Sequence, residues 1–438
     1  MSQHIPNRRN SVPSRREFMG ASTAAAVAGS LGIVGAAHAA GSDEIKIALI
    51  GCGGRGSGAT VQAMNTPANV KLVAMADAFQ DRVDISYRQI ASHHPDRVDV
   101  PDDRKFVGLD AYRKAIEADV DLVILATPPG FRPIHFEAAV NAGKHVFMEK
   151  PVATDAPGVR RILAANQVAK QKGLIVAVGL NLRHEDRYRE VVDRIHNGAI
   201  GELNFLRTYY NSGGVWVKPR EPGQTEMQYQ VRNWYYFNWL SGDHIVEQHV
   251  HSLDACNWIM KGPPVEAQGT GGRQVRKGKN YGEIFDHHSV EFTYADGTKM
   301  FSYCRHMPNC WVSVALHAHG TKGSANIEGV SSELHVDGQE PLKWRRGKVS
   351  HQVEHDDLFA ALLEGRPYNE GDYGATSTMT AIMGRMATYS GQIVRWDDAI
   401  KSEINLAPSQ MTWDAEPQSQ PDEHGLYACA IPGVTKVI

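Results

Sequence analysis

The hydrophobic pattern divides the chain into regions of different periodicity. Between residues 44 and 180, segments of helical spacing alternate with short apolar runs, which are "IKIALI", "VKLVAMAD", "VDLVILATPP", "HVFMEK" and "LIVAVGL". Apolar strands separated by helices are typical of a parallel sheet that is buried on both faces. The pattern therefore predicts a doubly wound α/β domain of the Rossmann type over residues 44–180.

Beyond this region the pattern changes to a period of two. The run "HSVEFTYADGTKMFSYCR" alternates apolar and polar positions on both sides of Asp296-Gly297, a pair that is typical of a tight hairpin turn. A second, mostly antiparallel domain is expected over residues 181–400. The final segment, residues 401–438, is rich in proline and non-periodic, which predicts an arm that packs on its own or on a neighbouring subunit.

The first 39 residues have the pattern of an export signal. Four arginines precede an uncharged stretch, residues 19–37, which is followed by the small-x-small cleavage pattern "AHA". The arginine pair in "SRREFMG" is typical of the twin-arginine route, which carries folded proteins. The alternative, an anchoring helix, is disfavoured because the stretch is poor in Leu and Ile. We expect residues 1–39 to be cleaved and the mature protein to be periplasmic.

Composition narrows the possible partners. Removing residues 1–39 takes away four arginines and one glutamate, so the formal charge moves from -3 to about -6. A mildly acidic, unclustered surface argues against nucleic acid as a partner, and no later segment approaches a membrane span. The five cysteines are an odd number without a C-x-x-C pair, which fits folding in a reducing compartment before export.

A glycine-rich turn follows the first apolar run at once, with the spacing Gly51-x-Gly53-x-x-Gly56. Such glycines allow a tight turn, a close approach of the backbone to a pyrophosphate and close packing of the next helix. The second apolar run ends in Asp77, where a carboxylate would accept the ribose 2′-hydroxyl of NAD and repel a 2′-phosphate. The alternative for Asp77 is a helix N-cap. The combination predicts NAD as the cofactor.

Five motifs in this order carry a family resemblance. The glycine-rich turn, "TPP", "AGKHVFMEKP", "GAIGEL" and "VEQHVHSLDACNW" together resemble the glucose-fructose oxidoreductase / inositol dehydrogenase / rhizopine-catabolism (Gfo/Idh/MocA) family over about residues 44–400. The resemblance implies a Rossmann domain followed by an α/β domain with a large, open, mostly antiparallel sheet. It implies nicotinamide-dependent redox chemistry at a sugar or polyol hydroxyl. It also implies a homo-oligomer, a dimer or tetramer formed through the open sheet. The cofactor-binding residues that we expect are Gly51, Gly53, Gly54, Arg55, Gly56, Asp77, Thr127, Pro128, Glu149 and Lys150.

Three residues are the predicted catalytic group. Lys150 matches the family lysine that reaches the substrate hydroxyl, where an ammonium would stabilise a developing alkoxide; a solvated surface lysine is the alternative. His251 matches the family histidine, and Glu247 stands where an aspartate is usual. On one helix starting near Asp243, Glu247 and His251 would share a face with Asp254, so the carboxylate could orient the imidazole that accepts the proton. Otherwise Glu247 complements the helix dipole.

Other positions are expected to contact the substrate. The segment "VRNWYYFNWL" packs five aromatic residues before the catalytic helix, as a wall for a sugar ring or as core packing. The candidate substrate contacts are Arg183, Tyr188, Trp216, Trp234, Tyr236 and Asp254. Arg132 stands where the family often has a histidine, and its guanidinium could bind a carboxylate or phosphate or cap the following helix.

No metal is expected, although two groups of residues have side chains that could bind one. The first group is His244, Glu247, His249 and His251, and the second is Asp286, His287 and His288. His249 points about 100° from its neighbours, and the family uses this helix without a metal.

Three functions remain open. The first is a sugar oxidoreductase with tightly bound NAD and a redox-neutral cycle. The second is a glycoside-cleaving enzyme that oxidises, eliminates, adds water and reduces again, as some members similar to this family do. The third, a sugar-binding protein with a structural nucleotide, is disfavoured because Lys150, His251 and a complete glycine turn are all present.

Overall fold

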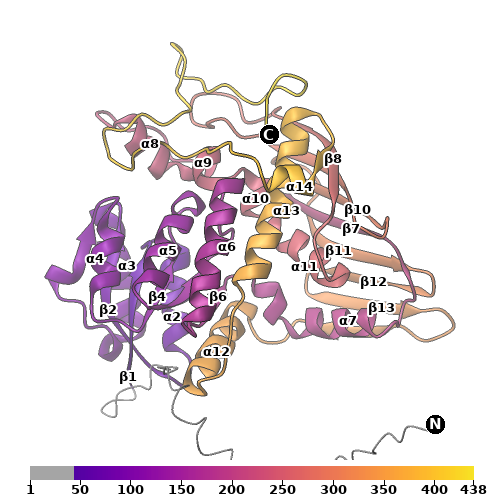
Figure 1. Ribbon diagram of the computed structural model, residues 1–438, viewed down its shortest axis with the longest axis horizontal. Helices are drawn as coiled ribbons and strands as arrows, with labels where there is room; N and C mark the ends of the chain where they lie inside the picture. The colour runs from indigo at the N-terminus through magenta and orange to yellow at the C-terminus, as the bar shows by residue number, and fades with distance from the viewer. Residues whose placement is uncertain (1–43) are drawn as a thin grey trace, which may run out of the picture. The chain divides into compact units, whose positions relative to one another are not determined.

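Two β-sheets organise the computed structural model, which describes residues 44–438 (Figure 1). The expected signal peptide, residues 1–39, lies outside the described residues. The first sheet has six strands that are all parallel, and the second has nine strands that are mostly antiparallel. The fold class expected from the sequence is therefore confirmed.

The first sheet has the strand order β3-β2-β1-β4-β5-β6. The order reverses between β1 and β4, and ligands of such sheets bind at the carboxyl ends of the strands beside this point. Its strands are β1 (Glu44–Ile50), β2 (Asn69–Asp77), β3 (Lys105–Val107), β4 (Leu122–Leu125), β5 (His145–Met148) and β6 (Val176–Val178). Its helices are α2 (Gly54–Met64), α3 (Gln80–His93), α4 (Ala111–Glu117), α5 (Arg132–Asn141) and α6 (Ala156–Gln171).

Both faces of the first sheet are buried, which explains the continuous apolar runs. Side chains of β1 alternate between two apolar clusters: Ile47 and Leu49 pack with α2, α3 and a later helix, α12 (Ser350–Leu363), whereas Ala48 and Ile50 pack with α4, α5 and α6. Helix α12 thus returns from the far end of the chain to cover the sheet. The carboxyl ends of β1, β4 and β5 are held in fixed positions by this packing.

The second sheet has the order β14-β13-β12-β11-β7-β10-β9-β8-β15, and only β7 and β10 run parallel. Asp296-Gly297 forms the expected turn between β9 and β10, with Gly297 at a φ of +89°. The strands are β7 (Leu203–Ser212), β8 (Glu266–Gly272), β9 (His287–Thr293), β10 (Lys299–His306), β11 (Ser313–Gly320), β12 (Gly323–Glu328), β13 (Ser331–Val336), β14 (Leu342–Arg345) and β15 (Val394–Arg395).

Helices cover one face of the second sheet. Helices α11 and α13 pack on this face, with Ile382 and Met383 of α13 in the same apolar cluster as Val290 and Phe292 of β9. The helices of this region are α7 (Asp186–His196), α8 (Glu226–Arg232), α9 (Asn238–Ser241), α10 (His244–Glu247), α11 (Val250–Met260), α13 (Gly371–Ser390) and α14 (Trp396–Ala399). Among residues 44–438, no helix is both long and apolar enough to cross a bilayer.

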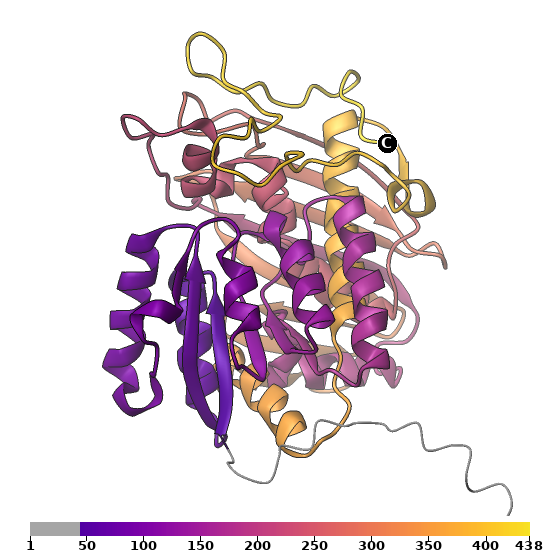
Figure 2. The same ribbon diagram turned by 60° about the vertical axis from the view of Figure 1, so that its left-hand side comes forward.

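The C-terminal arm, residues 401–438, packs on its own chain. It runs across α8 and α9 in both ribbon views (Figure 2). The Tyr427 hydroxyl donates to Glu226 Oε1 at 2.6 Å, and Gln230 Nε2 donates to the Ser419 carbonyl at 2.8 Å. The structure thus realises the first of the two arrangements expected for the arm.

Candidate active site

A cavity of about 540 Å³ lies at the carboxyl ends of β1, β2 and β4. It is lined on one side by seven of the expected cofactor-binding residues, which are Gly51, Gly53, Gly54, Arg55, Asp77, Thr127 and Pro128. The opposite side is formed by residues that precede Glu247 and His251 in the chain; they are Trp216, Lys218, Val231, Arg232 and Trp234. The charged lining side chains are four cations and one carboxylate, which are Arg55, Arg82, Lys218, Arg232 and Asp77. An excess of positive charge suits a diphosphate.

The glycine turn has the shape that a dinucleotide requires. A Cβ added at Gly53 or Gly54 would meet nothing within 4 Å, so both residues present bare backbone to the cavity. A Cβ at Gly56 would lie 2.0 Å from the Gly51 carbonyl oxygen, so α2 packs too closely there for any side chain. Helix α2 begins at Gly54, and the free N–H groups of its first turn suit a phosphate. The residues present therefore fit NAD.

Asp77 is placed to hold the ribose of the nucleotide. Its Oδ2 accepts a hydrogen bond from the Cys52 N–H at 2.7 Å, and its Oδ1 accepts from the Phe79 N–H at 3.0 Å. Helix α3 begins at Gln80 without a side-chain cap, so the N-cap alternative for Asp77 does not apply. Burial raises the pKa of the Asp77 carboxyl, and the two N–H donors act in the opposite direction. Each oxygen keeps a lone pair for a ribose hydroxyl.

The predicted lysine and glutamate meet beside the nucleotide cavity. Lys150, directly after β5, donates from Nζ to the Glu247 carbonyl oxygen at 2.6 Å and to Glu247 Oε1 at 3.0 Å. The two side chains are 11% and 9% exposed, and they come from positions 97 residues apart. The contact therefore holds the ammonium in a largely buried position between the end of β5 and the end of α10.

The prediction of one helix through Glu247 and His251 is wrong. Helix α10 ends at Glu247, and α11 begins only at Val250. Two polar contacts hold the residues of the break: Gln248 Oε1 accepts from the Tyr210 hydroxyl at 2.9 Å, and the buried His249 Nε2 lies 2.7 Å from Ser302 Oγ. These contacts with the second sheet override the local helical propensity.

The expected partnership of Glu247 with His251 is also wrong. Within the described residues, Glu247 Oε2 and His251 Nδ1 are both buried without a hydrogen-bond partner, and the carboxylate binds Lys150 instead. Burial, followed by the nearby charges of Lys150 and His351, holds the pKa of His251 well below its usual range. The imidazole is therefore neutral at neutral pH and can accept a proton.

The sequence did not reveal His351, which lies at the start of α12. It is close enough for its charge to act on His251, and burial lowers its own pKa, followed by the charge of Arg55. Glu149 also pairs with Arg55, at 2.7 Å between Oε1 and Nε. Neither Glu149 nor Lys150 lines the 540 Å³ cavity, so both lie outside its wall.

Two expected substrate contacts bind one another. Arg183 donates to both oxygens of Asp254, from Nε at 2.9 Å and from Nη2 at 2.8 Å. Asp254 is fully buried and also accepts from the Ser377 hydroxyl at 2.7 Å, while the Arg183 guanidinium lies 3.9 Å from the centre of the Tyr373 ring. These contacts join both residues to α13 through Ser377 and Tyr373, and their role toward the substrate stays a prediction.

Of the four aromatic residues expected to contact the substrate, two are buried in the core and two line the nucleotide cavity. Tyr188 and Tyr236 are buried in apolar clusters, and the Tyr236 hydroxyl donates to the Val215 carbonyl at 3.2 Å. Trp216 and Trp234 line the nucleotide cavity, with their ring centres 5.8 Å apart. The aromatic segment is therefore partly core and partly a wall of the cofactor site.

Arg132 fulfils neither role expected for it. Its guanidinium is buried and donates to the carbonyls of Leu125 at 2.7 Å and Thr127 at 2.6 Å. Burial lowers the pKa of Arg132 to about 10, so it remains cationic at neutral pH. It holds the loop after β4, which lines the cavity through Thr127 and Pro128.

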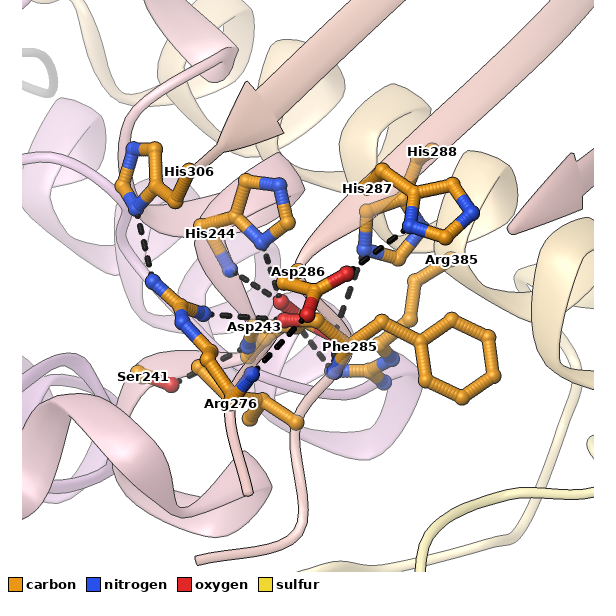
Figure 3. Close-up of polar contacts among 12 residues, drawn as sticks. Ser241, Asp243, His244, Arg276, Phe285, Asp286, His287, His288, His306 and Arg385 are labelled. Atoms are coloured by element: carbon orange, nitrogen blue, oxygen red, sulfur yellow. Dashed lines mark hydrogen bonds and ion pairs between the residues drawn. The ribbon is translucent and has the colours of Figure 1, made fainter. Parts of the chain in front are cut away.

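The buried His244, His288 and His306 lie around Asp243 at the start of α10 (Figure 3). Asp243 has a φ of +73°, and its Oδ2 accepts from the Phe285 N–H at 2.9 Å and the Tyr389 hydroxyl at 2.6 Å. The potential ligand atoms of Asp243, His244 and His288 lie within 4.8 Å of one another. The carboxylate accepts these donors, whereas His244 Nε2 and His288 Nε2 are buried without a hydrogen-bond partner in the part of the chain that the structure describes. The Asp243 carbonyl accepts from the Glu247 N–H at 2.9 Å, so the cluster anchors α10.

Comparisons with known proteins agree with this geometry. Residues 45–180 match the model of the oxidoreductase family with an NAD-binding Rossmann fold (GFO_IDH_MocA), and residues 188–326 match the GFO/IDH/MocA C-terminal domain. The chain belongs to this Gfo/Idh/MocA family of oxidoreductases, and NAD is its cofactor.

Among curated relatives, inositol 2-dehydrogenase of Rhizobium meliloti (strain 1021) is 26% identical over 65% of this chain and 76% of that protein. The 2,7-anhydro-N-acetylneuraminate hydratase of Mediterraneibacter gnavus is 28% identical over 56% of this chain and 61% of that protein.

Two solved structures show the same fold. Aldose-aldose oxidoreductase from Caulobacter crescentus, complexed with glycerol, has a TM-score of 0.63 and 20% identity, and the alignment covers 80% of this chain and 99% of that one. Levoglucosan dehydrogenase in complex with NADH and levoglucosan has a TM-score of 0.64 and 17% identity, with the same coverage.

Asp77→Asn is expected to narrow the preference for NAD over NADP. The amide retains an acceptor for the Cys52 N–H but removes the charge that repels a 2′-phosphate, which we expect to change the ratio of affinities about tenfold. Titration of the nucleotide-free protein with NADH and NADPH measures both affinities. Tighter binding of NADPH by the unaltered protein would remove Asp77 from the ribose site.

Asp254→Asn is expected to destabilise the fold by about 3–5 kcal/mol, because it leaves the Arg183 guanidinium half-buried without its counter-ion. Thermal unfolding of the two proteins measures the difference. Glu137→Gln breaks the exposed pair with Arg161 and serves as the control, with an expected loss of about 1 kcal/mol or less. An Asp254→Asn variant of unchanged stability and weakened substrate binding would instead favour the substrate role.

Proposed function

We propose that this protein is an exported oxidoreductase that acts on a hydroxyl group of a sugar, polyol or glycoside and keeps its NAD bound through the catalytic cycle. One observation carries the proposal. Lys150 is held by Glu247 at the carboxyl end of β5, near a cavity that fits NAD, and its charge acts on the neutral His251.

The side chains of the chain have complementary roles in this chemistry. Bound NAD supplies the acceptor for the hydride that leaves the substrate carbon. The Lys150 ammonium is positioned to donate to the substrate oxygen and stabilises the negative charge that develops there. His251 accepts the hydroxyl proton because its low pKa keeps the imidazole neutral. Glu247 holds Lys150 through two oxygens, so the ammonium keeps one orientation.

The names of the related proteins support a carbohydrate substrate. They mention inositol, an anhydro sugar acid, aldoses and levoglucosan, which are small polyhydroxylated molecules. Two of the names also describe net reactions without loss of electrons, one between two aldoses and one a hydration. They favour a redox-neutral cycle, either sugar-to-sugar transfer or, as a second candidate, glycoside cleavage through transient oxidation and addition of water.

Export as a folded holoenzyme follows from the twin-arginine pattern in residues 14–20. All five cysteines lie within residues 44–438 and are free thiols, which supports folding in a reducing compartment. Little free nucleotide is expected outside the cytoplasm, so a cofactor that is exported with the protein has to be regenerated in place. We therefore propose a periplasmic location and a resident NAD.

A homo-oligomer is part of the same proposal. The face of the second sheet opposite α11 and α13 carries stacked rings, with the centres of Tyr209 and Tyr303 5.4 Å apart. Trp311 is 61% exposed, and its ring centre lies 5.4 Å from that of Tyr209. Exposed aromatic rings on an open sheet suit an interaction surface, and a second copy of the same sheet is the proposed partner.

Lys150→Ala is expected to lower the rate of hydride transfer by on the order of 10²-fold or more while NAD remains bound. His251→Ala should lose a similar factor. Glu247→Gln should lose less, because it retains the main-chain carbonyl that accepts from Lys150. Reduction of bound NAD is followed by NADH absorbance with myo-inositol, levoglucosan and glucose as substrates. Unchanged turnover in Lys150→Ala would refute the assignment.

The acid limb of the pH profile should lie well below pH 6.5, the ordinary pKa of histidine. His251 can accept a proton only while its imidazole is neutral. Because its pKa is lowered, the imidazole becomes protonated only at a lower pH. Oxidation rates measured between about pH 4 and pH 8 test this expectation. Activity that is already lost at pH 6.5 would show that His251 is not the base.

The mature protein purified after export is expected to release close to one nucleotide per chain when denatured, and to turn over without added NAD. A glycoside with a coloured aglycone separates the two redox-neutral cycles, because only the cleavage reaction releases the colour. Protein that is isolated empty and requires a continuous supply of NAD would contradict the resident cofactor.

A further inference from the structure

Three distant segments of the chain meet at one wall of the nucleotide cavity. Arg232, the last residue of α8, and Phe79, in the loop after β2, both line the cavity. The Arg232 guanidinium lies 3.7 Å from the centre of the Phe79 ring, and the ring centre of Trp413 in the C-terminal arm lies 5.3 Å from that of Phe79.

An ion pair closes the same wall. Arg232 donates to Asp81 through two bonds, from Nη1 to Oδ2 at 2.8 Å and from Nη2 to Oδ1 at 2.6 Å. The Arg232 guanidinium lowers the pKa of Asp81, so the carboxylate is ionised at neutral pH. Asp81 belongs to the first turn of α3, only four residues after Asp77, the expected ribose partner. The pair therefore ties the ribose-binding loop to the opposite side of the cavity.

A hydrogen bond to α8 also holds the C-terminal arm in place at Trp413. The Thr225 hydroxyl donates to the Trp413 carbonyl at 2.9 Å, and Thr225 also caps α8 together with Gln228. Arg232 at the end of that helix and Trp413 on the arm are thus held by one short element. The loop bearing Phe79 cannot move away from the cavity without breaking contacts with both.

We propose that Arg232, Asp81, Phe79 and Trp413 form a clamp that retains the NAD of this protein by slowing its release. The inference rests on the proposed resident cofactor, because retention matters only if NAD is not replenished. The clamp acts on the rate of release: its contacts must open before the nucleotide leaves, whereas the phosphates and the ribose are bound by the glycine turn and Asp77.

The test compares the release of NADH from the mature protein and from variants. Each protein is emptied, loaded with NADH and mixed with excess NAD, and the loss of bound NADH fluorescence gives the rate constant. Arg232→Met keeps most of the side-chain volume, removes the ion pair and the cation–π contact, and is expected to release NADH about tenfold faster. Trp413→Ala should also accelerate release.

Asp81→Asn removes the ion pair by changing its half-exposed partner. This second variant tests the clamp even if Arg232→Met does not fold. If the clamp acts as a unit, the double variant Asp81→Asn/Arg232→Met releases NADH no faster than Arg232→Met alone. Arg161→Met is the matched control, because Arg161 forms an exposed ion pair with Glu137 and does not line the cavity. Its release rate should equal that of the unaltered protein.

Equal release rates in Arg232→Met, Asp81→Asn and the unaltered protein would overturn the clamp. If Arg232→Met accelerates NADH release but Trp413→Ala does not, the proposed role of the C-terminal arm in the clamp is overturned. The outcome for the resident cofactor is separate: an unaltered protein that is isolated empty refutes retention across export, while a faster release from Arg232→Met still supports the clamp.

Discussion

The contact between Lys150 and Glu247 is the interaction on which the active site depends. A buried ion pair contributes little to stability, because the loss of hydration offsets much of its attraction. Here the ammonium also donates to the Glu247 main-chain carbonyl, so its position is set by backbone as well as by charge. The site therefore assembles only when the end of β5 and the end of α10 are correctly placed, which couples the packing of both sheets to the geometry of catalysis.

The placement of α10 depends in turn on Asp243. A non-glycine residue at a φ of +73° is strained, and such strain persists only where the surroundings compensate for it. The Asp243 carboxylate provides this compensation by accepting from the Tyr389 hydroxyl and the Phe285 N–H. The histidines around it are buried, and burial lowers the pKa of His244 to about 4, so that ring is neutral. The cluster that resembles a metal site is thus the anchor of the helix that positions Glu247.

The sequence predicted features that depend on local pattern. The parallel sheet with its helices lies within residues 44–180 as expected, and the turn at Asp296-Gly297 is where the alternation placed it. The glycine turn and Asp77 were found because their spacing follows from the geometry of a nucleotide. In each case the neighbours along the chain determine the structure.

The errors concern contacts between distant residues. The break after Glu247 results from the partners of Gln248 and His249 on the second sheet, which no helical periodicity reveals. Arg183 and Asp254 are 71 residues apart and bind one another, a contact that the local pattern does not reveal. His351 reaches the site because α12 returns to the first sheet, and its position in the sequence gave no signal.

The clamp and the chemistry impose different requirements on the same cavity. Where no free nucleotide is present, tight binding at equilibrium gives no protection by mass action, and the lifetime of the complex is set by the rate of release alone. That rate depends on contacts which must break before the nucleotide moves, and these need not touch it. The contacts of Phe79 with Arg232 and Trp413 are of this kind, and Phe79 lies two residues from Asp77. The reacting end is distinct, because Lys150 and Glu247 lie beyond the wall of the cavity. A chain built in this way can exchange its sugar substrate at one end while the other end of the cofactor stays closed.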